Sequence, residues 1–201
     1  MKICLTVLAL LSLIRADLSA ATIGPDVAVM EVQIGKQKEL QRVVIGLYDS
    51  ATSQTVANFK ELVGKNFYRG LRFHRAFPGT LVQTGDPKSR SGDVDRSGTG
   101  GPGYTIPAEI GLKHVRGAVA MSRLSDTVNP ARASNGSQFY VCLTDMPKLN
   151  GKYTVFGEIL EGMDVLDAIS NEQTDSNDFP LAKIEIKSMV IQSRFAPSTS
   201  E

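Results

Sequence analysis

Short runs of alternating apolar and polar residues dominate the chain, and residues that favour turns separate them. The run at 29–34 alternates regularly, and the run at 42–48 does so less cleanly. Alternation with this period is typical of strands that bury one face. Further runs predict strands at 71–77, 80–83, 117–122, 138–143, 153–160 and 184–191, which makes about eight strands in all.

Two other segments have helical spacing instead. Val56, Phe59 and Leu62 recur at intervals of three and predict a helix that ends near Gly64. The same spacing of apolar residues predicts a second helix over 163–169. Many short strands, two helices and frequent Gly and Pro turns predict a mostly β fold, closed into a barrel or packed as a sandwich.

The domain organisation is simple. We find no internal repeat and no interdomain linker, so residues 22–194 are expected to form one domain. The polar stretch at 195–201 is expected to be a disordered tail.

Residues 1–21 differ in character from the rest of the chain. Lys2 precedes an apolar run at 3–14, and small residues at 19–21 follow a polar break. These are the features of a signal peptide that is cleaved on export, either to the periplasm or to the outside of the cell. A buried first helix or a retained anchor is the alternative. We favour cleavage, because Arg15 interrupts the run before it reaches the roughly 20 residues that span a bilayer.

The charge of the chain excludes one broad class of partner. Its 22 Lys and Arg residues oppose 21 Asp and Glu residues, for a formal charge of +1. Removal of residues 1–21 would leave 20 residues of each sign. Since nucleic-acid-binding proteins need a basic surface, no nucleic-acid partner is expected. We also expect no stable membrane association after signal cleavage.

Candidate metal ligands and nucleophiles are few. The two histidines, His74 and His114, are far apart in the sequence, and no Cys and His residues have the spacing of a zinc site. Cys4 falls in the predicted signal peptide. Cys142 lies in an apolar run, where a small buried side chain is a commoner role than a nucleophile.

The stretch at 87–103 is rich in Gly, Ser and charged residues and predicts a long surface loop. Its residues 98–103 match a dinucleotide-binding motif by letter, but no strand precedes them and Pro107 prevents a regular helix after them. Its residues 93–98 imitate the start of a calcium-binding loop, but Tyr104 occupies the position of the required acid. We therefore expect neither a cofactor nor a metal.

A longer motif begins at Phe73. Residues 73–86 read Phe-His-Arg-Ala-Phe-Pro-Gly-Thr-Leu-Val-Gln-Thr-Gly-Asp. This sequence resembles the F-H-R-x-x-P-G-F-x-x-Q-G-G-D signature of cyclophilin-type peptidyl-prolyl cis–trans isomerases. Further blocks that resemble the family follow in the family's order at 98–104, 113–114, 117–121, 135–139 and 149–157. The resemblance covers most of 29–191 and implies a closed eight-stranded antiparallel β-barrel capped by two α-helices.

The resemblance assigns the chemistry to Arg75. Rotation about an X–Pro bond makes and breaks no bond, so it needs only a group that binds the transition state more tightly than the ground state. A guanidinium that donates to the prolyl nitrogen meets this requirement. The resemblance also implies that Gln83 holds the arginine and contacts the substrate backbone. The backbone around Ser122 and Arg123 would pair with an extended peptide, and Gln138 would line the same groove.

The resemblance further implies an apolar pocket for the proline ring. Its expected wall residues are Thr80, Leu81, Tyr140, Leu149 and Tyr153. Several positions depart from the family's pattern. Thr80 replaces a phenylalanine, Tyr153 a histidine and Lys148 a frequent tryptophan. Thr84 replaces the second glycine of Q-G-G-D, and Ser122-Arg123 replaces the common Ala-Asn. The loop at 124–133 is longer than in compact members. Thr80 leaves the pocket more open, unless this loop folds over it and supplies Leu124 or Val128.

Taken together, these features predict a monomeric isomerase that acts on proline-containing polypeptides and assists the folding of exported proteins. The alternative is a proline-peptide binding module or holdase chaperone with little catalysis. Thr80 and the long loop are the features that favour this alternative.

Overall fold

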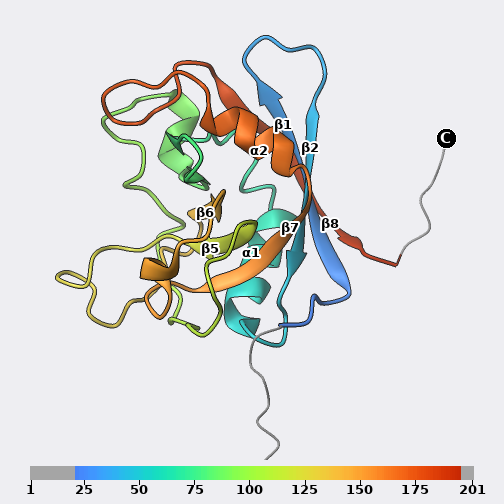
Figure 1. Cartoon of the computed structure of the whole chain (residues 1–201), viewed down its shortest axis with the longest axis vertical. Helices are drawn as coiled ribbons and strands as arrows, with labels where there is room; N and C mark the ends of the chain where they lie inside the picture. Colours follow the sequence, from blue (N-terminus) through green and yellow to red (C-terminus); the bar gives the residue numbers. More distant parts are fainter. Residues whose placement is uncertain (1–20, 196–201) are drawn as a thin grey trace, which may run out of the picture.

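The computed structural model describes residues 21–195 (Figure 1). Residues 1–20 of the predicted signal peptide and 196–201 of the predicted tail lie outside this range. Eight strands and two α-helices make up the fold, as the sequence pattern predicts. In chain order they are β1 (Asp26–Ile34), β2 (Gln41–Leu47), α1 (Ser53–Gly64), β3 (Arg75–Phe77), β4 (Leu81–Thr84), β5 (Ala118–Met121), β6 (Phe139–Cys142), β7 (Val155–Glu161), α2 (Met163–Ser170) and β8 (Ile184–Ser193).

The eight strands form one antiparallel sheet in the order β3-β4-β6-β5-β7-β2-β1-β8. The prediction of a closed barrel is wrong, because the sheet is an open half-barrel whose end strands β3 and β8 are not paired with each other. Only the segment before β3 reaches β8, through an isolated bridge between Arg72 and Glu185 and three backbone hydrogen bonds between residues 70–73 and 184–186. Strand β3 has three residues, and its Ala76 amide donates to the carbonyl of Asp178 in the loop before β8 rather than to β8 itself. A closed barrel has no exposed edge strand. In this half-barrel, the loop before β8 covers the exposed edge of β3.

Both faces of the sheet are covered by protein. In β6, Phe139 and Val141 belong to the main core, whereas Tyr140 and Cys142 belong to a second apolar cluster on the opposite face. Successive side chains of a strand point to opposite faces, so the run at 139–142 is apolar throughout instead of alternating. The second cluster lies on the face of the sheet that faces away from the main core.

The two helices pack against the main core. In α1, Phe59 is almost fully buried and its ring centroid lies 5.2 Å from that of Phe156 and 5.8 Å from that of Phe139. In α2, Leu166 and Ile169 are fully buried, and the helix contacts β2, β3 and β4. The helices thus stabilise the strands that carry the signature motif.

The long loop at 87–103 begins with a 3₁₀ turn, η1 (Pro87–Ser91), and the buried carboxylate of Asp86 organises it. Asp86 accepts hydrogen bonds from the backbone amides of Lys88 at 2.7 Å and of Gly100 at 3.0 Å. The two ends of the loop are thereby held close together, beside the strand that precedes it.

Candidate functional site

One row of side chains crosses four neighbouring strands. Arg75 on β3 is paired with Gln83 on β4, Gln83 with Tyr140 on β6, and Tyr140 with Ala120 on β5. Residues directly opposite each other in antiparallel strands project from the same face of the sheet. The register therefore places the signature arginine, the signature glutamine and a tyrosine side by side, on the face opposite the main core.

The guanidinium of Arg75 is free of protein partners. Arg75 is exposed, and among residues 21–195 it has no hydrogen bond or ion pair. The expected contact between Arg75 and Gln83 is therefore not formed. The Gln83 amide nitrogen donates instead to Gln138 Oε1 at 2.8 Å and to Ser122 Oγ at 3.3 Å. Gln138 is fixed in turn by a 2.7 Å bond to the Gly100 carbonyl.

The backbone of Ser122 is already engaged. Its amide donates to the Gln138 carbonyl at 2.9 Å, and its carbonyl accepts from Asn135 at 2.8 Å. The expected pairing of a peptide with the backbone around Ser122 and Arg123 stays a prediction. The Arg123 side chain is only 4% exposed and lies over the Tyr153 ring at 4.6 Å.

The expected pocket residues lie together on the outer face. Leu81, Leu149 and Tyr153 are half-buried and pack against the cluster that contains Tyr140. The Tyr140 and Tyr153 rings are 5.9 Å apart and nearly perpendicular, a favourable aromatic geometry. Leu149 is delivered by a second 3₁₀ turn, η2 (Pro147–Leu149). The remaining members of the cluster are Tyr48, Leu112, Ala118, Ala120, Cys142, Met146 and Val155.

Motif reasoning overlooked the polar support beneath the pocket. His114 Nε2 is 3.0 Å from the Tyr140 hydroxyl, and His114 Nδ1 is 3.2 Å from Asn150 Oδ1. With Nδ1–H donating to Asn150, Nε2 is left to accept the hydroxyl proton. Burial lowers the pKa of His114, against the opposing hydrogen bond to Asn150, and burial raises the pKa of Tyr140. The His114–Tyr140 pair is therefore neutral at pH 7. The Lys113-His114 block, which resembles the family, was the sequence feature from which His114 could have been identified.

The polar groups of Thr80 have hydrogen-bond partners within the protein. Its hydroxyl donates to the Pro78 carbonyl at 3.2 Å, and its own carbonyl accepts from Leu143 at 2.8 Å. The loop at 124–133 does not rebuild this part of the wall, because Leu124 and Val128 are 68% and 66% exposed. The structure therefore favours an open pocket at Thr80.

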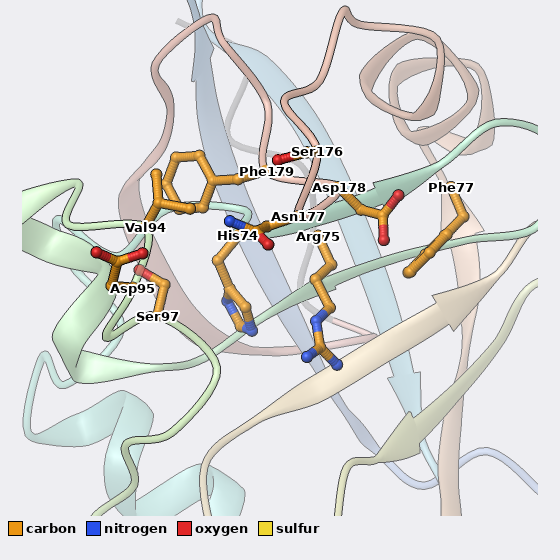
Figure 2. Close-up of a pocket in the computed structure, with 10 residues that line it drawn as sticks. All are labelled: His74, Arg75, Phe77, Val94, Asp95, Ser97, Ser176, Asn177, Asp178 and Phe179. Atoms are coloured by element: carbon orange, nitrogen blue, oxygen red, sulfur yellow. The ribbon is translucent and has the colours of Figure 1, made fainter.

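A polar cavity of about 600 Å³ adjoins Arg75 and is walled by the loops that hold Asp95 and Asp178 (Figure 2). His74 also lines it and is 2% exposed. Burial lowers the pKa of His74 to about 4, against an opposing attraction from Asp86. His74 is thus neutral at pH 7 and adds no charge beside Arg75.

Neither a nucleophile nor a metal cluster stands out in the part of the chain that the structure describes. Cys142 is fully buried, as predicted, and burial raises the pKa of its thiol to about 12. No three His, Cys, Asp or Glu residues within 21–195 are grouped so that they could hold a metal ion. No described helix is both long and apolar enough to cross a membrane.

An exposed arginine lies beside an apolar cluster on the outer face of this half-barrel. Comparison with known proteins identifies the class of protein that has this arrangement. The family model "Cyclophilin type peptidyl-prolyl cis-trans isomerase/CLD" matches residues 29–191. The chain therefore belongs to this family, and the prediction that it is a peptidyl-prolyl cis–trans isomerase is confirmed.

Curated relatives and solved structures agree with this assignment. A peptidyl-prolyl cis-trans isomerase of Helicobacter pylori is 39% identical over 132 residues, which are 63% of this chain and 73% of that protein. Peptidyl-prolyl cis-trans isomerase B of Bacillus subtilis is 39% identical over 65% of this chain and 84% of its own length. A crystal structure of a cyclophilin type isomerase from Cryptosporidium parvum, determined in the presence of the dipeptide Ala-Pro, aligns with a TM-score of 0.70 and 28% identity. It covers 83% of this chain and 99% of that one.

Proposed function

We propose that this isomerase acts on X–Pro bonds of exported polypeptides and assists their folding, with Arg75 as the catalytic residue. The observation that carries the proposal is the position of the Arg75 guanidinium. It is exposed, free of described partners, and next in the strand register to the residues that border the apolar pocket. The crystal of the Cryptosporidium relative with Ala-Pro supports a proline-containing peptide as the ligand.

The chemistry requires only differential binding. Amide resonance opposes rotation with a barrier of roughly 18–20 kcal/mol, and uncatalysed X–Pro exchange takes about 10–100 s or more. Acceleration from ~100 s to ~1 ms corresponds to about 10⁵-fold, or roughly 7 kcal/mol. As the bond twists, the prolyl nitrogen regains its lone pair and becomes an acceptor. Arg75 can then donate a hydrogen bond that the planar ground state does not accept.

The apolar pocket adds to this effect by positioning the ring. Leu81, Leu149 and the two tyrosine rings offer apolar surface to proline and exclude water from one side of the arginine. A donor acts more strongly where water is excluded, because the local dielectric is lower. Gln83 is held by Gln138 and Ser122, so its carbonyl oxygen is oriented rather than free to rotate.

The catalytic role is tested by Arg75→Ala. We expect kcat/KM for an Ala-Pro peptide to fall by about 100- to 1000-fold, as for the loss of one well-placed transition-state donor. Arg75→Lys should restore part of the activity, since it keeps the charge but not the planar fork. Thermal stability should stay close to that of the wild type because Arg75 has no described partner to lose. Wild-type turnover in a folded Arg75→Ala protein would contradict the assignment.

The export role is tested separately. The full chain should be expressed in a Gram-negative host, and the soluble protein of each cell fraction should be analysed by intact mass. We expect a mature chain that begins after Ala20 or Ala21 and is recovered from the periplasm or the medium. A full-length protein found only in the cytoplasm would contradict export and leave the catalytic assignment untouched.

A binding module or holdase is the second candidate. It is favoured by Thr80, which offers less apolar surface to a proline ring than phenylalanine would. Exchange NMR on an Ala-Pro peptide separates the two functions. Saturable binding without faster cis–trans exchange would favour the binding module.

A further inference from the structure

Two arginines that share one carboxylate fasten the loop at 124–133 to the rest of the site. Asp126 Oδ1 accepts from Arg123 at 2.6 Å, and Asp126 Oδ2 accepts from Arg132 at 2.9 Å. Arg123 Nη1 also donates to the Leu124 carbonyl at 2.8 Å. One further donor from each arginine reaches the segment just before Tyr153. Arg123 Nε donates to the Lys152 carbonyl at 2.7 Å, and Arg132 Nη1 donates to the Gly151 carbonyl at 2.8 Å.

Arg123 connects this network to the proline pocket. Its guanidinium carbon lies 4.6 Å from the centroid of the Tyr153 ring, within the range of a cation–π contact. Tyr153 in turn stands nearly perpendicular to Tyr140, with ring centroids 5.9 Å apart. The Tyr153 ring is therefore fixed by Arg123 as well as by Tyr140.

Asp126 is the group that allows this arrangement. A covered guanidinium is costly unless a carboxylate or several carbonyls accept from it. The Arg123 side chain is 4% exposed, and Asp126, at 51%, is the one acid paired with it among residues 21–195. Hydrogen bonds from Arg123 and then from Arg132 lower the pKa of Asp126, so it is ionised at neutral pH. Without this charge, Arg123 would gain by turning outward to water and would uncover Tyr153.

We propose that Asp126 is a positioning residue of the isomerase site. The network of Arg123, Asp126 and Arg132, here called the arginine clamp, holds the Tyr153 ring in the orientation that packs against the proline ring. The clamp contacts Tyr153 and not the reacting nitrogen, so it contributes to the ground state and the transition state alike. This inference rests on the proposed function, because it assumes that Tyr153 forms part of the proline pocket.

The test measures kcat and KM separately for a blocked, uncharged Ala-Pro peptide. We expect Asp126→Asn to raise KM by about 5-fold and to change kcat by less than about 2-fold, the pattern for lost uniform binding. Asp126→Glu should restore much of the affinity, because it keeps the charge. The matched control is Asp167→Asn, which removes the carboxylate from the Arg116–Asp167 pair, a partly exposed ion pair between α2 and the segment before β5. This control should leave KM unchanged.

The dependence of KM on salt concentration is a second measurement. It would not differ between the wild type and Asp126→Asn if Asp126 only stabilised the fold. The clamp is open to solvent at Asp126, so about 0.5 M NaCl should weaken it by screening. The KM of the wild type should therefore rise with salt relative to that of Asp126→Asn, which has no such pair left to screen. Because the peptide is uncharged, salt does not change KM by screening a long-range electrostatic attraction between the protein and the peptide.

The outcomes separate the two proposals. A wild type that does not accelerate exchange contradicts the proposed function itself. An active wild type whose KM and salt response are both unchanged by Asp126→Asn overturns the clamp. If Asp126→Asn does not fold, Arg132→Gln takes its place, since it removes the other arginine of the clamp and keeps the Arg123–Asp126 pair. We expect it to raise KM by about 2-fold, and an unchanged KM in that variant would equally overturn the clamp.

Discussion

The arginines near the site differ in whether their guanidinium groups already have partners within the protein. Arg123 and Arg132 are committed to Asp126 and to backbone carbonyls, and Arg116 is paired with Asp167. Arg75 alone among these four has no described partner. A guanidinium already bound by carboxylates would have to break those bonds before it could reach a substrate. The free donors of Arg75 need no such rearrangement, which is the form of preorganisation that transition-state binding requires.

Thr80 is the residue most suited to improvement. Its hydroxyl is satisfied by the Pro78 carbonyl, and neither Leu124 nor Val128 covers it. We expect Thr80→Phe to raise kcat/KM several-fold, because added aromatic surface against a partly exposed proline ring is worth about 1 kcal/mol. Initial rates on an Ala-Pro peptide check this. A fall in activity would mean that the site is already full, since overpacking costs about 1–3 kcal/mol.

At the scale of elements, the loop at 87–103 acts as a support for β4 and β6. Asp86 holds the Gly100 amide, and the Gly100 carbonyl accepts from both Gln138 and Asn135. Gln138 then orients Gln83. A chain of hydrogen bonds thus links a buried carboxylate to the groove without passing through the main core.

This chain predicts an effect of Asp86→Ala on both stability and activity. Two backbone amides would lose their acceptor in a buried place, which should cost about 2–4 kcal/mol of unfolding free energy. The freed Gly100 should also loosen Gln138, so kcat/KM should fall in molecules that remain folded. Urea unfolding and the peptide assay measure the two effects.

The same loop offers a control for that experiment. The Asp93 carboxylate makes no hydrogen bond or ion pair with any residue in the described range, so Asp93→Ala should change neither quantity. Equal losses in the two variants would show that the loop tolerates no substitution and that Asp86 has no special role.

At the scale of the whole molecule, the half-barrel leaves its two edge strands to be covered by other means. The loop before β8 covers β3 through the bond from Ala76 to Asp178. That loop and the residues near Asp95 enclose the polar cavity beside Arg75 (Figure 2). The open edge of the fold and Arg75, the proposed catalytic residue, are therefore neighbours.

The free energy of unfolding should depend on pH through His74, which is buried at the cavity beside Arg75. Its pKa is about 4 in the folded chain and 6.5 in its ordinary state, so the unfolded chain binds the extra proton first as pH falls. The stabilisation is thus fully present above pH 6.5 and is lost as pH falls toward 4. We expect this residue to account for about 3 kcal/mol of lost unfolding free energy.

The measurement compares urea unfolding at pH 7, 5 and 4 in the wild type and in His74→Gln. The variant should show a shallower dependence on pH, because it lacks the titrating group. His114, whose pKa is also lowered by burial, contributes in the same direction and remains in both proteins. Parallel pH profiles would show that His74 does not titrate on unfolding as expected.

Much of this molecule could be read from its residues alone. Local periodicity predicted the eight strands and both helices, because the alternation of side chains is set by neighbours in the chain. The ordered motifs from Phe73 onward were sufficient to indicate the family and to single out Arg75. The side chains around Tyr140 and Tyr153 that were expected to line the proline pocket lie in one apolar cluster, and their role in binding proline stays a prediction.

Other features were decided only by the tertiary structure. Closure of the sheet depended on whether the three-residue strand β3 would pair with β8 or with a loop. The local sequence pattern does not determine which of the two occurs. Gln83 binds Gln138 and Ser122 rather than Arg75, and Arg123 packs on Tyr153 beside Asp126. Long polar side chains can reach several partners, and segments distant in sequence determine which one is near. The sequence by itself therefore determined the strands and the motif that contains Arg75, whereas the folded chain decided which groups surround that motif and hold it in place.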